Sequence, residues 1–158
     1  MICGIPATFP ARGTFLGSIT VTKVLLSIHV LAAIIAIGPV TVAASMFPAV
    51  ARRGDGRALG LLHRICRVYS TIAVAVPVFG LATASSLGVL GDAWLLTSIA
   101  LTVLAAALLG LAILPRQRRL IDDGGDARRL GMLTGVFNLL WAVVVVLMIV
   151  RPGSTTGV

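Results

Sequence analysis

One ionisable side chain, His29, lies inside a long uncharged stretch that begins at Val24. Ionisable groups in such stretches are functional candidates, because a charge is costly in a membrane interior. An imidazole can ligate haem or a metal ion, or relay a proton. It can also hydrogen-bond a backbone carbonyl or a Ser or Thr hydroxyl. The second interpretation is favoured, because a metal site needs further His, Cys, Asp or Glu ligands at matching depth and His63 lies near the other membrane face.

A cofactor at His29 would need a second ligand from outside the apolar stretches, where Met1 and Cys3 are available, or from a partner chain. Other chemistry has little support. The chain has no glutamate, no glycine-rich nucleotide loop, and aspartates only in or beside expected loops. These features argue against a conventional hydrolase or ATPase, so we assign no catalytic residue and no metal site.

Other polar and small residues in the apolar stretches are better suited to packing. The amide of Asn138 most simply cross-links two helices, and it is less suited to lining a substrate path. Gly80 begins a Gly-x-x-x-Ala pattern, and Gly131 and Gly135 form a Gly-x-x-x-Gly pattern. Small residues at this spacing allow helices to approach closely.

The elements that carry these residues are expected to be transmembrane helices. Hydrophobic residues make up 58% of the 158 residues and charged residues only 11%, against about 25% charged in soluble domains. An uncharged run of ~20 residues is long enough to cross a bilayer, and lipid requires it to be helical. We predict an all-α, four-helix transmembrane domain over 21–151, after an irregular external lead-in (1–20) and before an external tail (152–158). The expected spans are about 24–48, 66–90, 93–115 and 130–150.

The basic residues indicate orientation. Ten of the 13 Lys and Arg lie in two short segments, which become cytoplasmic loops by the positive-inside rule and place both termini outside. The same arginines can contact anionic lipid headgroups. No aromatic residues are interleaved with them, which argues against nucleic acid despite a net charge of +8. They are Arg52, Arg53, Arg57, Arg64, Arg67, Arg116, Arg118, Arg119, Arg128 and Arg129.

A nine-residue phrase occurs twice. GDGRALGLL (54–62) and GDARRLGML (125–133) share six positions, and each follows a helix expected to end near a proline, Pro48 or Pro115. In each phrase a glycine permits a turn, and Asp55 or Asp126 is suited to cap the next helix. The phrase is therefore a helix start signal. A parallel duplication of a two-helix hairpin explains it, as does recurrent loop chemistry in a chain of biased composition.

The chain resembles a bacterial family of four-span membrane proteins known only as a domain of unknown function (number twenty-two sixty-nine). The likeness covers about 21–153 and is carried by HVLAA (29–33), Gly38-Pro39, the two repeated phrases, LPR (114–116) and VLMIVRPG (146–153). It implies a bacterial plasma-membrane protein, distantly similar to copper-resistance membrane proteins and to a haem-pathway oxidase. By that likeness, haem or copper would bind at His29.

These observations favour a non-enzymatic membrane protein. It would act as a helper or subunit of a membrane assembly, or as a bundle that handles lipids or small solutes. Its expected partners are membrane lipids and either other membrane subunits or further copies of itself. The alternative is a haem- or copper-binding membrane protein that uses His29.

Overall fold

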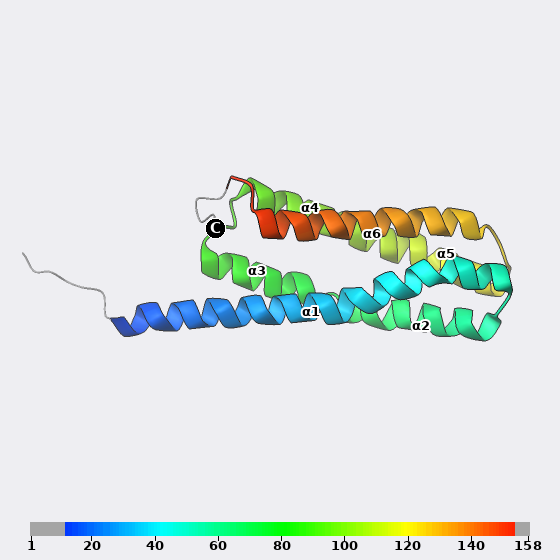
Figure 1. The fold of residues 1–158 in the computed structure, drawn as a ribbon, viewed down its shortest axis with the longest axis horizontal. Helices are drawn as coiled ribbons and strands as arrows, with labels where there is room; N and C mark the ends of the chain where they lie inside the picture. The colour runs from blue at the N-terminus through cyan, green and yellow to red at the C-terminus, as the bar shows by residue number, and fades with distance from the viewer. Residues whose placement is uncertain (1–11, 154–158) are drawn as a thin grey trace, which may run out of the picture.

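The computed structural model describes residues 12–153, with side chains from Thr20 onward, and this part of the chain is helical with no strand. The polypeptide forms four rods that run up and down beside one another (Figure 1), which confirms the expected all-α bundle. The elements are α1 (Arg12–Arg53), α2 (Gly56–Ile72), α3 (Ala75–Leu87), α4 (Ala93–Ala107), the π-helix η1 (Leu108–Ile113), α5 (Leu114–Asp122) and α6 (Ala127–Val150).

Four helical stretches are long and apolar enough to cross a membrane. Two rods are composite: α2 and α3 make the second, and α4, η1 and α5 make the third. Every rod continues beyond its predicted span at one end or both, because charged side chains at a helix end can reach the headgroups while the backbone keeps its own hydrogen bonds. The stretches are Thr20–Arg53, Gly56–Leu87, Ala93–Asp122 and Ala127–Val150.

The first helix begins earlier than the sequence suggested. α1 starts at Arg12, inside the expected irregular lead-in 1–20, which therefore shortens. The physical reason is that no proline follows Pro10 until Pro39, so nothing in the backbone stops a helix there. At 42 residues, α1 is about 63 Å long. Its first turns run beyond the ends of α3 and α6 (Figure 1).

Prolines bend the rods rather than end them. α1 continues through both Pro39 and Pro48 to Arg53, and Figure 1 shows it turning toward α6 in its second half. The second rod breaks between α2 and α3, just before Pro77 in the first turn of α3, where a missing N–H is tolerated. In the third rod, the wide turns of η1 precede Pro115. The expected helix ends at Pro48 and Pro115 are therefore corrected, because neighbouring helices and local adjustment accommodate the lost hydrogen bonds.

The helix start signals are confirmed. Asp55 caps α2 by accepting a hydrogen bond from the Ala58 N–H at 3.1 Å. Asp126 caps α6 by accepting from the N–H groups of Arg128 and Arg129 at 2.9 and 3.3 Å. The two aspartates have nearly the same backbone angles, φ −81° with ψ 89° and φ −81° with ψ 92°. The repeated phrase thus performs the same local task at both sites.

The core is concentrated at one end of the bundle. We call this the arginine-rich end, formed by the turns 53–56 and 122–127. There α1 packs on α2 and α6, and α2 packs on α5. Twelve buried apolar residues from all four rods form its core, including Phe47, Ile113 and Phe137. At the opposite end a smaller cluster around Trp94 joins α3 to α4. The four rods are therefore locked together mainly at the arginine-rich end.

Candidate functional site

His29 lies against the backbone of α3. Its Nδ1 is 2.9 Å from the carbonyl oxygen of Val76, so the protonated nitrogen donates to that carbonyl. The imidazole occupies a notch at Gly80, where an added Cβ would lie only 2.9 Å from Cε1 of His29. Gly80 thus accommodates a side chain from α1. This contact is of the kind that the sequence favoured for His29, a hydrogen bond to a backbone carbonyl.

The surroundings of His29 offer few further ligands. Among residues 12–153 no group of three or more His, Cys, Asp or Glu could hold a metal ion. Met1 and Cys3, the suggested second ligands, lie outside the described residues. The bond to Val76 orients the ring and makes Nε2 the lone-pair nitrogen in the neutral form. That is the arrangement in which a histidine presents one nitrogen as a ligand while a carbonyl holds the other.

A second polar group lies in the core of the arginine-rich end and was not predicted. Gln117 on α5 is fully buried. Its Oε1 accepts a hydrogen bond from Nδ1 of His63 at 3.1 Å, and its Nε2 donates to Sγ of Cys66 at 3.5 Å. The Cys66 thiol in turn points to the carbonyl of Val40 at 4.0 Å, a weak contact. Three rods are therefore joined by one chain of polar groups, which we call the Gln117 link.

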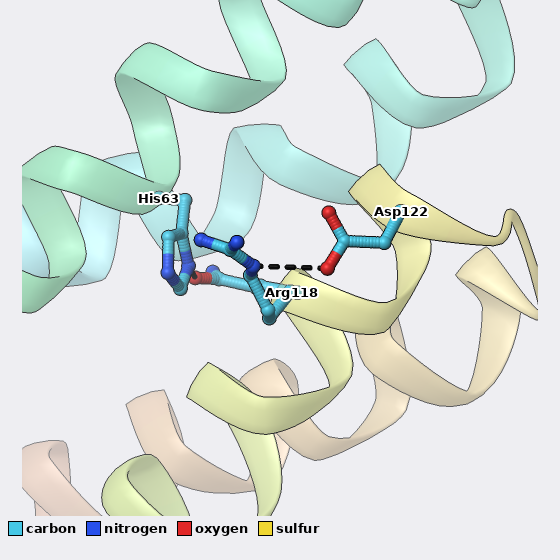
Figure 2. Close-up of polar contacts among 4 residues, drawn as sticks. His63, Arg118 and Asp122 are labelled. Atoms are coloured by element: carbon cyan, nitrogen blue, oxygen red, sulfur yellow. Dashed lines mark hydrogen bonds and ion pairs between the residues drawn. The ribbon is translucent and has the colours of Figure 1, made fainter.

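The residues on either side of Gln117 in the chain, Arg116 and Arg118, are exposed. Figure 2 shows His63 beside α5, with Arg118 turned to Asp122 on the same helix. That ion pair, 2.9 Å from Nε to the carboxylate oxygen, is exposed at both side chains, so it contributes less than about 1 kcal/mol. A sequence signal for the link did exist. His63 and Cys66 are three residues apart and share a helix face, and Gln117 is the uncharged position in the run RQRR.

Asn138 connects α6 to α1. Its Nδ2 donates to Oγ of Ser45 at 2.9 Å, which is the kind of cross-link expected for it. Its Oδ1 and the nearby Nε1 of Trp141 are buried without a protein partner among the described residues. A Cβ at Gly131 would meet Pro48 of α1 at 3.6 Å, an ordinary contact, whereas a Cβ at Gly135 would meet nothing within 4 Å. Of the two glycines, Gly131 is therefore the one at the helix contact.

A further polar cluster at the opposite end was also missed. Nε1 of Trp94 donates to the carboxylate of Asp92 at 2.9 Å. The guanidinium of Arg151, just after α6, lies 5.7 Å from the centre of the Trp94 ring, within the range of a cation–π interaction. Arg151 adopts φ 45°, unusual for a residue other than glycine. This cluster fastens the end of α6 to the start of α4.

The ten arginines predicted to face headgroups are all exposed, and they gather at the arginine-rich end. Two form ion pairs within their own segment, Arg118 with Asp122 and Arg129 with Asp126. Positive charge therefore remains in large excess on this surface.

No family model, curated protein or solved structure matches the chain. The resemblance to the four-span family thus rests on the residues quoted for it, and function has to be argued from the geometry.

Proposed function

We propose that this chain is a non-enzymatic helper subunit of a membrane assembly. The supporting observation is that three polar side chains in the candidate spans, each from a different rod, bind another helix of the same chain. His29 bonds α3, Asn138 bonds α1, and Gln117 bonds two residues of α2. These contacts fix the bundle instead of converging on one reactive centre. A structural role in the bilayer accounts for them without a chemical reaction.

The contact surface that we propose for a partner is the part of α1 that precedes Pro39. Ile34 there is 64% exposed. The helix is about 63 Å long, roughly twice the ~30 Å hydrocarbon layer, and its start runs past the neighbouring helices (Figure 1). It therefore offers surface both within the bilayer and beyond it, to another membrane subunit or to a second copy.

Site-specific photo-crosslinking tests this role. A benzophenone side chain would replace Ile34 on α1 or, as the control, Leu139 on α6, which is 65% exposed. We expect Ile34 to yield one protein adduct at constant stoichiometry and Leu139 to yield lipid adducts. Lipid adducts at both positions, together with a monomer on native gels, would contradict the subunit role and favour a bundle that handles lipids or small solutes.

We further propose that the protein lies in the bacterial plasma membrane with the arginine-rich end in the cytoplasm and both termini outside. The ten exposed arginines at that end support this orientation through the positive-inside rule. In a Cys3→Ser background, Leu90→Cys should react with an impermeant maleimide added to intact cells, and Asp123→Cys only after lysis. The reverse pattern would overturn the orientation.

A second candidate function is haem or copper binding at His29. The observation in its favour is the Nδ1 bond to the Val76 carbonyl, which orients the ring and makes Nε2 the available nitrogen. Absorption spectra and metal analysis of the purified protein beside His29→Ala test it. A Soret band or stoichiometric copper lost in the variant supports the site. Wild-type protein with neither signal ends the idea.

A further inference from the structure

A hollow of about 180 Å³ lies at the arginine-rich end, between the end of α5 and the start of α6. Three arginines surround it, Arg116, Arg119 and Arg129, and Asp126 is the one acidic residue in its wall. The side chain of Leu120 and the two turn glycines complete the lining. The hollow therefore carries two positive charges in excess, at the place where the third and fourth rods meet.

The guanidinium groups retain unused donors. Arg116 donates one hydrogen bond, from Nη1 to the carbonyl oxygen of Ala112 at 3.2 Å. Arg129 directs its Nε to Asp126 at 3.4 Å, which leaves its terminal nitrogens available. Arg119 has no polar partner among the described residues. The first amides of α6 do not contribute, because Asp126 already accepts from two of them. An anion here would be bound by side chains.

Two glycines form the turn between the helices and line the hollow. Gly124 and Gly125 have φ of 74° and 148°. The backbone of L residues that carry a side chain rarely adopts such angles. A Cβ at Gly125 would come within 3.8 Å of Leu120, an ordinary contact with another residue of the lining. The turn thus keeps its backbone bare next to the three arginines.

We propose that this hollow binds the phosphate group of an anionic phospholipid. Its volume corresponds to roughly six water molecules at ~30 Å³ each, enough for a phosphate. Guanidinium groups bind phosphate oxygens in pairs of parallel hydrogen bonds. The hollow is at the end of the third candidate span, Ala93–Asp122, where headgroups lie if that rod crosses the bilayer. Leu120 supplies apolar contact for the lipid beside the phosphate. Lipid binding at this hollow would require no partner protein and is separate from the helper role.

Lipid retention by the full chain tests the site. The protein would be placed in nanodiscs of zwitterionic lipid doped with phosphatidylglycerol, and retained lipids counted by native mass spectrometry. We expect one phosphatidylglycerol per chain, retained about tenfold more weakly in Arg119→Gln, the factor that the loss of one hydrogen bond to a charged group, about 1.5 kcal/mol, implies. Arg119→Lys keeps the charge but loses the planar pair of donors. Its lipid retention should therefore lie between that of the wild type and that of Arg119→Gln.

The matched control is Arg128→Gln, which removes the same charge from an exposed neighbour outside the hollow. It should change retention less than twofold. Equal losses in Arg119→Gln and Arg128→Gln would overturn the proposal in favour of general surface attraction.

Inorganic phosphate provides the second arm. If the lipid is the ligand, excess phosphate in solution should leave most of the phosphatidylglycerol in place. Phosphate that binds the wild type in neutral nanodiscs, depends on Arg119, and displaces the lipid completely would instead identify a site for free phosphate, and the lipid proposal would fall.

Discussion

Replacing Gln117 by leucine should weaken the bundle more than any exposed change on α5. The substitution nearly conserves volume but removes both hydrogen bonds of a fully buried side chain. Nδ1 of His63 then loses its partner at the edge of the core, and Sγ of Cys66 loses its donor. The third rod would lose both of its hydrogen bonds to the second, whereas the contacts of His29 with Val76 and of Cys66 with Val40 would still join the first rod to the second.

The magnitude follows from these contacts. Hydrogen bonds between membrane helices contribute on average about 0.6 kcal/mol each. A buried polar group left without a partner costs about 1–3 kcal/mol. His63 is only half-buried and can recruit water, so the lower end of that range applies. We therefore expect Gln117→Leu to lower the free energy of unfolding by about 2 kcal/mol.

Unfolding by sodium dodecyl sulfate in mixed micelles measures this loss, followed by helical circular dichroism and by the fluorescence of Trp94 and Trp141. The matched control is Arg118→Gln on the same helix, which removes an exposed ion pair with Asp122 and should cost less than about 1 kcal/mol.

The double variant His63→Leu/Gln117→Leu provides the sharper comparison. With both partners apolar, neither is left unsatisfied, so its stability should return to within about 1 kcal/mol of wild type. The reasoning would be refuted if Gln117→Leu were as stable as Arg118→Gln. It would also be refuted if the double variant were less stable than the single one.

Three further changes test other contacts. Gly80→Ala places a Cβ 2.9 Å from the His29 ring and should lower the free energy of unfolding by about 1–3 kcal/mol. Adding His29→Ala to the same chain should recover part of this loss. Purely additive losses in the double variant would argue against the notch. Asp126→Ala should cost about 1 kcal/mol and more than Asp55→Ala, because Asp126 accepts two backbone hydrogen bonds and Asp55 one; thermal unfolding in detergent would show the order, and a larger loss for Asp55→Ala would contradict it. Asn138→Leu should cost less than about 1 kcal/mol, because it removes one interhelical bond together with a buried oxygen that has no partner in the described part of the chain. A loss above about 2 kcal/mol would mean that this oxygen is bonded.

The sequence by itself determined the local features of this protein. Four long uncharged runs had to be helices, because a backbone in lipid can satisfy its hydrogen bonds only within the segment. The positions of Asp55 and Asp126 fixed two helix starts, because capping depends on residues two or three places along the chain. Helix lengths were predicted less well. The helices continue into charged turns beyond each uncharged run, and a search for uncharged residues does not detect those turns.

Only the tertiary structure decided which groups meet. His29 and Val76 are 47 residues apart, His63 and Gln117 are 54 apart, and Ser45 and Asn138 are 93 apart. Composition could indicate that these side chains needed partners, but not which partners they would find. Helix rotation, the change of direction of α1 in its second half (Figure 1) and the wide turns of η1 set the facing surfaces. Which surfaces face one another depends on the packing of all four rods at once, so a local sequence pattern cannot predict it.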